Sequence, residues 1–165
     1  MARRIDHRSS VPRPADEVAA AMLDPDYLRA RLDRMGGPGA ALLEHEAGPD
    51  GGRYRIRHGI DQAMLPSIVR NLVSGDLMIE RTETLRRSSE NHWAGDTDVR
   101  IPGAPVSARG TMAVTGGPAS SEFLVTAEVT VAVPFIGGRI EATIAENVAQ
   151  LLAAETTFTL EWLKR

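Results

Sequence analysis

Residues 134–165 decide the fold, and they read PFIGGRIEATIAENVAQLLAAETTFTLEWLKR. Apolar residues recur in this stretch at steps of three and four, which is the spacing of one face of an α-helix. They are Ile136, Ile140, Ile144, Val148, Leu151, Leu152, Phe158 and Trp162. A helix of this length spans roughly 40 Å, more than a small domain needs to close its core, so it must lie along a wide apolar surface.

The residues before this helix predict a sheet that supplies the surface. Residues 121–133 alternate between Val, Ala or Phe and polar side chains, which is the pattern of a half-buried strand. Similar patterns predict strands over 3–11, 40–47, 53–60, 76–87, 90–101 and 105–116. Together they predict a seven-stranded antiparallel sheet wrapped around the C-terminal helix.

The second and third of these strands form a predicted hairpin around Pro49-Asp50-Gly51-Gly52. Tyr54, Ile56 and His58 would face the interior together with Leu43 and His45. On the solvent side of the hairpin, Glu44 and Glu46 would face arginines of the other strand. Such cross-strand pairs of opposite charge are favourable. After the hairpin, residues 64–73 break the alternation and predict an apolar connector with a short helical turn, either a lip over a cavity or a core-packing segment.

Two short helices are expected between the first two strands. Pro12 and Pro14 end the first strand, and Asp16 and Glu17 then suit the first turn of a helix. Asp24-Pro25 begins a second helix, with Asp24 as its N-cap, and Gly36-Gly37 ends it. The whole architecture is therefore α+β.

Composition narrows the class of protein. The 165 residues suit one domain over 1–165, and 42% hydrophobic with 25% charged residues is usual for a globular protein. A net charge of −3 leaves no basic excess to neutralise phosphates, so we expect no nucleic-acid partner. No run of 18 apolar residues exists, so no stable membrane insertion is expected. Without cysteine or the apolar core of a signal peptide, a cytoplasmic location is the simplest expectation.

Two phrases of the sequence carry a resemblance to a known superfamily. One is Ser9 to Leu28, with Pro12, Asp24-Pro25 and Tyr27; the other is Val133 to Trp162, in which Pro134 to Glu141 open the last helix. Together with the predicted order of helices and strands, these two phrases resemble the START-like (SRPBCC, birch-pollen-allergen-like) superfamily. More narrowly, they resemble an uncharacterised actinobacterial branch of that superfamily. The resemblance implies the helix-grip fold and the binding of lipids or other apolar molecules, with cyclases or hydrolases as a minority. Fold alone does not transfer function.

The residues expected to face a cavity between helix and sheet fall into two groups. The apolar group is Ile79, Trp93, Met112, Val129, Ile144, Val148 and Leu151, and the polar group is His7, His45, Tyr54, His58, Arg81, Asn147 and Glu155. His7, His45 and His58 lie on the first three strands, which the helix-grip resemblance implies to be neighbours. They would line a polar end of the cavity or bond backbone groups or, alternatively, hold zinc or iron. We predict no metal ion and no cofactor.

Glu155 is the least expected residue of the apolar helix face, because a buried carboxylate is costly unless it is paired, hydrogen-bonded or protonated. Either it is a cavity acid with a raised pKa, or it reaches water or an arginine. Arg81 and Glu83 alternate in phase with Leu77 and Ile79. They would form an inward ion pair unless a bulge turns both to solvent.

Three functions follow from these residues. The first is a protein that binds or carries a lipid or another apolar or amphipathic small molecule in the cavity. The second is a cyclase- or hydrolase-type enzyme that uses Glu155 or His58 as acid or base on an apolar substrate. The third is a protein with a filled core and a partner-binding surface. We predict the first and assign no catalytic residue. The oligomeric state stays open.

Overall fold

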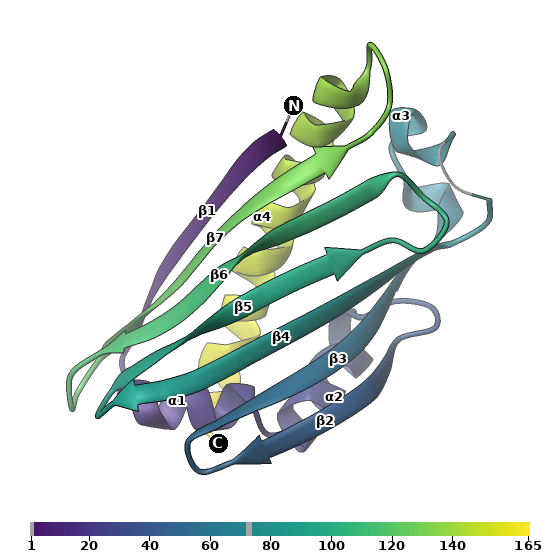
Figure 1. Cartoon of the computed structure of the whole chain (residues 1–165). Coiled ribbons are helices and arrows are strands. Elements are labelled where there is room, and N and C mark those ends of the chain that lie inside the picture. The colour runs from purple at the N-terminus through teal and green to yellow at the C-terminus, as the bar shows by residue number, and fades with distance from the viewer. Residues whose placement is uncertain (1, 72–73) are drawn as a thin grey trace.

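The computed structural model describes residues 2–71 and 74–165, and it shows one antiparallel sheet with a long helix across one face (Figure 1). The strands are β1 (Ala2–Val11), β2 (Ala41–Gly48), β3 (Gly51–Ile60), β4 (Leu77–Ser89), β5 (His92–Arg100), β6 (Val106–Gly116) and β7 (Ser121–Val131). The helices are α1 (Ala15–Met22), α2 (Pro25–Met35), the 3-10 turn η1 (Gln62–Met64), α3 (Ser67–Arg70) and α4 (Gly137–Leu163). The seven strands, the two short helices after β1 and the long C-terminal helix confirm the predicted helix-grip architecture.

The local signals at the first two helices act as expected. The Asp24 carboxylate accepts a hydrogen bond from the backbone N–H of Asp26 at 2.8 Å, and Pro25 occupies the first turn of α2. Asp16 and Glu17 lie in the first turn of α1. The Asp24 contact fixes where α2 starts, because it satisfies a backbone N–H group that has no partner inside the helix. Helix α1 has no side-chain cap, and its two acids instead suit the positive end of the helix dipole.

The hairpin β2–β3 has the predicted faces except at Leu43: Leu42 lies opposite the inward Ile56 and packs on the core in its place, so the prediction for Leu43 is wrong. Tyr54, Ile56 and His58 are buried, and Glu44 binds Arg53 at 3.0 Å and Arg55 at 3.5 Å on the outer face. A register shift between Leu42 and Glu44 interrupts the pairing without exchanging the faces of the following residues. The inner face of β3 therefore delivers Tyr54 and His58 to the interior.

The prediction that the first three strands are neighbours is wrong. The strand order is β1-β7-β6-β5-β4-β3-β2, so β1 and β2 form opposite edges of the sheet. The connection through α1 and α2 carries the chain across one end of the sheet, and it returns at the far edge (Figure 1). As a result β1 pairs with β7, the last strand, and places His7 opposite Val125.

The predicted helix opens at Pro134, but α4 begins three residues later, at Gly137. Phe135 has a left-handed backbone (φ 69°), and Ile136 then serves as the N-cap of a helix that runs from Gly137. Ile136 is consequently exposed and does not belong to the buried stripe, which begins with the fully buried Ile140. The apolar period identifies the helix, but the backbone turn at Phe135 decides its first residue.

The expected connector after β3 contains η1 and α3, and its residues 72 and 73 lie outside the described part of the chain. Leu65 and Val69 are buried, whereas Met64 is 79% exposed. Between residues 62 and 71 the connector thus packs Leu65 and Val69 on the core and presents Met64 outward. Among the described residues, no helix is long and apolar enough to cross a membrane.

Gly59 permits a close approach between β3 and the loop after α2. A Cβ atom there would lie 1.6 Å from the carbonyl oxygen of Pro38, while the Gly59 N–H donates to the Gly36 carbonyl at 2.7 Å. We expect Gly59→Ala to lower the free energy of unfolding by about 1–3 kcal/mol, because backbone atoms must move. Chemical denaturation checks this, with Gly48→Ala as control, since no atom lies within 4 Å of a Cβ at Gly48. Equal losses in both variants would contradict the explanation.

Candidate ligand-binding cavity

A cavity of about 390 Å³ lies between α4 and the inner face of the sheet. Helix α4 packs chiefly against β1 and β7, so the space opens toward β3, β4, β5 and β6. Most of its wall is apolar, with Ile79, Val99, Val129, Ile144, Val148 and Leu151 among the lining residues. Met64, Leu65 and Val69 of the η1–α3 connector line it as well. Ligand sites in proteins commonly have about 300–1,000 Å³ and this apolar character.

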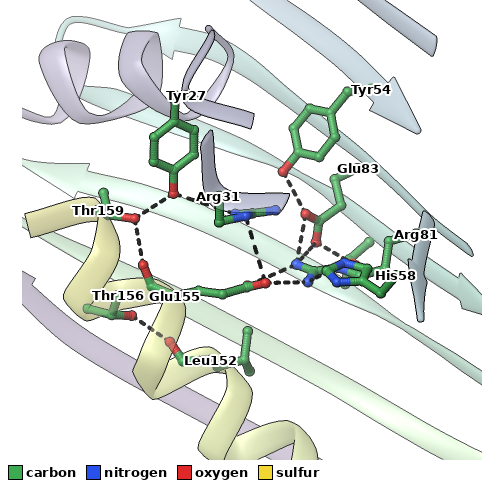
Figure 2. A network of polar contacts seen from close by, with 11 residues as sticks. Tyr27, Arg31, Tyr54, His58, Arg81, Glu83, Leu152, Glu155, Thr156 and Thr159 are labelled. Atoms are coloured by element: carbon green, nitrogen blue, oxygen red, sulfur yellow. Dashed lines mark hydrogen bonds and ion pairs between the residues drawn. The ribbon is translucent and has the colours of Figure 1, made fainter. Parts of the chain in front are cut away.

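A buried cluster of charged side chains forms the polar end of this cavity (Figure 2). Arg81 on β4 is at its centre: it binds Glu155 of α4 at 2.8 Å and Glu83 of its own strand at 3.0 Å. Arg31 of α2 approaches Glu155 from the other side at 3.8 Å. The exposed fractions of these four side chains are only 4–8%. Two cations and two anions thus neutralise one another out of contact with water.

Neutral donors complete the bonding of Glu83. The Tyr54 hydroxyl donates to Oε1 of Glu83 at 2.6 Å, and the Thr97 hydroxyl donates to Oε2 at 2.8 Å. With both bonds from Arg81 to Glu83, every carboxylate oxygen of Glu83 has two donors. A carboxylate so surrounded is held in its ionised form.

The pKa values of both carboxyl groups follow from this pairing. Burial alone would raise the pKa of Glu155, but the charges of Arg31 and Arg81 outweigh it and lower the pKa to about 2. Burial also opposes the lowered pKa of Glu83, where Arg81 and Arg31 prevail. The possibility of a raised pKa at Glu155 is therefore wrong, and the alternative of a carboxylate that meets an arginine is confirmed. The inward ion pair of Arg81 and Glu83 is confirmed too.

His58 stands beside the cluster in its neutral form. Burial and the positive charge of Arg81 lower the pKa of His58 to about 4. Its Nε2 lies 3.4 Å from Nη1 of Arg81. Since a guanidinium can only donate, Nε2 must be the acceptor, which places the imidazole proton on Nδ1. His58 lines the main cavity, so its neutral imidazole belongs to the polar end.

A second, much smaller pocket of about 20 Å³ lies behind the cluster. Arg31, Glu155, Met112 and Ser9 are among its lining residues. Within the described residues, Nε and Nη2 of Arg31 and Oγ of Ser9 have no hydrogen-bond partner. This volume suits about one water molecule, and buried water molecules commonly bond buried polar atoms that have no partner in the protein. The cluster therefore separates the main cavity from a small pocket that is lined by residues with unbonded polar atoms.

The predicted site residues fall into three groups in the structure. Those that line the main cavity are His58, Ile79, Arg81, Val129, Ile144, Asn147, Val148 and Leu151. Glu155 and Met112 line the small pocket, and Tyr54 lies behind Glu83. Trp93 contacts neither pocket, because its indole N–H donates to Asp16 at 2.7 Å. Asn147 is exposed and donates to the Thr143 carbonyl, so it lies where the cavity meets solvent.

The three histidines do not come together. His7 bonds Thr156 of α4 at 3.0 Å, His45 bonds the Leu23 carbonyl at 2.6 Å, and His58 contacts Arg81. The strand order explains this, because β1 lies at the opposite edge from β2. No group of three metal-ligating side chains occurs among residues 2–71 and 74–165, so the alternative of zinc or iron held by these three histidines does not fit the structure.

Arg31 is the member of the cluster that the sequence patterns missed. It lies at helical spacing between Tyr27 and Met35, on the buried face of α2. The sequence signal that could have identified Arg31 is a charged residue on an otherwise apolar helix face, which is the same signal that identified Glu155. Tyr27 supports the same junction, since its hydroxyl bonds Thr159 of α4 at 2.6 Å (Figure 2).

The chain has the helix-grip fold that START-like proteins share. Comparison with solved structures agrees: a START superfamily protein from Mycobacterium smegmatis matches with a TM-score of 0.53 at 15% identity, over 97% of this chain and 98% of that one. The Zhui aromatase/cyclase from a Streptomyces species matches with a TM-score of 0.56 at 15% identity, over 98% and 90%. At these identities the likeness concerns the fold alone.

More narrowly, the chain belongs to the family described as "Protein of unknown function (DUF2505)", whose model matches residues 6–163. An uncharacterised protein of Mycobacterium tuberculosis is 31% identical over 170 residues, covering 99% of this chain and 98% of the relative. This relative agrees with the actinobacterial branch that the sequence resembles.

Proposed function

We propose that this protein binds an apolar small molecule, such as a lipid, in the cavity between α4 and the sheet. The observation that carries the proposal is a cavity of about 390 Å³ whose wall is apolar except at one end. Burial of ligand surface would supply the affinity, at about 25 cal/mol for each Å² of apolar area. The START-like fold, which typically holds apolar ligands, supports the same function.

The polar end favours an uncharged polar group on the ligand. Arg31 and Arg81 already balance Glu83 and Glu155, and His58 is neutral. An ionised ligand group would bring an unpaired charge to this buried end, which is unfavourable. A hydroxyl or carbonyl group needs only a neutral donor, and Nδ1–H of His58 is one.

An acid–base enzyme is less well supported by this geometry. A general acid must carry a proton near the working pH, whereas the lowered pKa of Glu155 keeps it ionised. Its two oxygens are also engaged by Arg81. We therefore assign the cluster a positioning and stabilising role, and Glu155 no catalytic one.

The first experiment is native mass spectrometry of the purified protein, with organic extraction and identification of any bound molecule. The second measures how hexadecanol and hexadecanoate displace the neutral fluorescent probe N-phenyl-naphthylamine from the protein. The probe should bind at one site, and hexadecanol should displace it at lower concentration than hexadecanoate does. Probe binding that neither competitor reduces would contradict a ligand cavity, and stronger competition by hexadecanoate would contradict the neutral polar end.

A substitution that fills the cavity tests its location. Ala108 of β6 lines the cavity, and we expect Ala108→Trp to weaken binding of the neutral probe at least about tenfold, because the indole takes the ligand's volume. Ala153→Trp is the matched control, since Ala153 is exposed on α4. Fluorescence titration gives both affinities, and circular dichroism verifies folding. An unchanged affinity in Ala108→Trp would place the bound probe elsewhere.

A further inference from the structure

Three large apolar side chains remain exposed among the described residues, and all lie at one end of the sheet. They are Met64, Phe135 and Ile136, which are 79%, 105% and 40% exposed, and we name them the apolar rim. Met64 belongs to η1 after β3, while Phe135 and Ile136 lie between β7 and α4. Figure 1 shows both connections at the end of the sheet that also holds the N-terminus and α3, away from α1 and the C-terminus.

The apolar rim borders the opening of the cavity. Met64 lines the cavity and is nevertheless mostly exposed, so it stands where the cavity meets solvent. Ile101 and Ala104 of the β5–β6 turn line the cavity at the same end. That turn is joined to the end of β7 by a hydrogen bond from Ala132 N–H to the Pro105 carbonyl at 2.9 Å. The exposed side chains of the apolar rim therefore continue into the apolar wall of the cavity.

Phe135 is held outward by its backbone. Its φ of 69° is left-handed, a conformation that is a rare and strained one for a bulky side chain. Asparagine or glycine would fit this position with less strain, and neither would expose an aromatic ring to water. Stability of the fold thus accounts for neither the residue type nor its conformation, and strain of this kind concentrates at functional sites.

The charges around the rim complement an anionic surface. In the two rim segments, residues 62–71 and 129–140, the only charged residues are Arg70 and Arg139. Arg3, beside Val129 at the start of β1, adds a third exposed cation. An apolar rim flanked by arginines suits the boundary of a bilayer, where anionic headgroups meet acyl chains.

Three acids that flank the rim segments accept hydrogen bonds or lie opposite arginines. Glu141 is buried and accepts a hydrogen bond from the Val131 N–H at 2.8 Å. Asp61 accepts one from the backbone N–H of Ala63 at 2.9 Å. Glu128 is exposed but lies opposite arginines of both neighbouring strands, Arg4 and Arg109. Asp76 accepts a hydrogen bond from the Gln62 N–H at 3.0 Å, and Glu146 lines a surface hollow together with Arg3. The positive charge of the rim therefore rests chiefly on the exposed Arg70 and Arg139.

We propose that the apolar rim docks on the surface of an anionic lipid bilayer. Phe135, Ile136 and Met64 enter the headgroup region, Arg139 and Arg70 contact anionic headgroups, and the cavity opens against the bilayer. An apolar ligand then passes between membrane and cavity without crossing water. The route of the ligand rests on the proposed function, whereas the docking itself rests on the rim.

Vesicle flotation tests the docking with the intact protein. Vesicles of phosphatidylcholine alone are compared with vesicles that also contain phosphatidylglycerol. We expect the protein to float with the anionic vesicles, and Phe135→Asn to weaken this binding about tenfold, the loss expected from one large apolar side chain. Because asparagine tolerates a left-handed backbone, this variant should unfold at the same temperature as the parent or a higher one.

Charge is tested by a matched pair of variants. Arg139→Glu should reduce flotation with anionic vesicles, whereas Arg86→Glu, an exposed position near the opposite end of β4, should not. Flotation with neither type of vesicle, or equal flotation of the parent protein and Phe135→Asn, would overturn the proposal. Self-association that disappears in Phe135→Asn, measured by sedimentation without vesicles, would replace the membrane with a second copy of the chain.

The neutral-probe titration separates this proposal from the proposed function. Phe135→Asn should bind the probe in vesicle-free buffer as the parent does, because Phe135 does not line the cavity. Flotation that depends on Phe135, in a protein that binds no probe, would support docking while contradicting the ligand cavity. Probe binding without flotation would support the ligand cavity while contradicting docking.

Discussion

Replacing Arg81 with methionine is expected to lower the free energy of unfolding by about 3–5 kcal/mol, one of the largest effects of any single substitution in this chain. The guanidinium makes close contacts with Glu83 and Glu155, and both carboxylates are buried. Its removal leaves one excess negative charge in the interior, where water does not screen it. Chemical denaturation of the parent protein and of Arg81→Met measures the loss.

Two further variants separate the buried charge from other effects. Arg55→Met removes a partly exposed arginine from Glu44 and Glu80, and it should cost at most about 1 kcal/mol, as partly exposed pairs do. Arg81→Met combined with Glu155→Met leaves Arg31 and Glu83 in balance, so it should be more stable than Arg81→Met alone. A double variant less stable than Arg81→Met would show that packing, and not charge, dominates.

Acidification is expected to destabilise the fold in two steps that belong to the same cluster. The pKa of His58 is lowered from 6.5 to about 4, so the unfolded chain binds a proton more readily than the folded one. The stability that this contributes is fully present above pH 6.5 and is lost as the pH falls toward about 4. A shift of this size corresponds to roughly 3 kcal/mol.

Glu155 adds the second step at lower pH. Its pKa is lowered from 4.5 to about 2, so its contribution is present above pH 4.5 and is lost as the pH falls toward about 2. Protonation would leave Arg31 and Arg81 without their shared anion, again at a cost of roughly 3 kcal/mol.

Urea denaturation across this pH range measures both steps. His58→Phe should flatten the dependence between pH 6.5 and about 4, and leave the lower step in place. His92→Asn, at an exposed histidine, is the control and should leave the dependence unchanged. A His58→Phe profile identical to that of the parent would contradict the assignment of the upper step.

Much of the fold is predictable because the apolar period is a local property. The alternation of β3 places Tyr54 and His58 inside, and the same alternation on β4 places Arg81 and Glu83 there. Both assignments hold since consecutive strand residues must point to opposite faces. The helical period likewise places Glu155 on the buried face of α4. Each of these residues is identified by its conflict with the apolar neighbours on its own element.

The partners of these residues are not predictable in the same way. The hydrophobic period of a helix or strand predicts which of its faces is buried, but it does not predict which other element packs against that face. The charge of Glu155 is set by Arg81 from β4 and Arg31 from α2, which are 74 and 124 positions away along the chain. The predicted neighbourhood of His7 is wrong for the same reason, because the long connection through α1 and α2 places β1 beside β7.

The sequence by itself determined the elements and their faces, because hydrophobic periodicity and capping act over a few residues, and its resemblance to START-like proteins implied the helix-grip class. Only the tertiary structure decided that three separate elements bring two arginines and two glutamates into one neutral cluster at the end of an apolar cavity. The physical reason is that a buried charge takes its state from whatever lies within a few ångströms of it, and those neighbours are chosen by the packing of the whole chain.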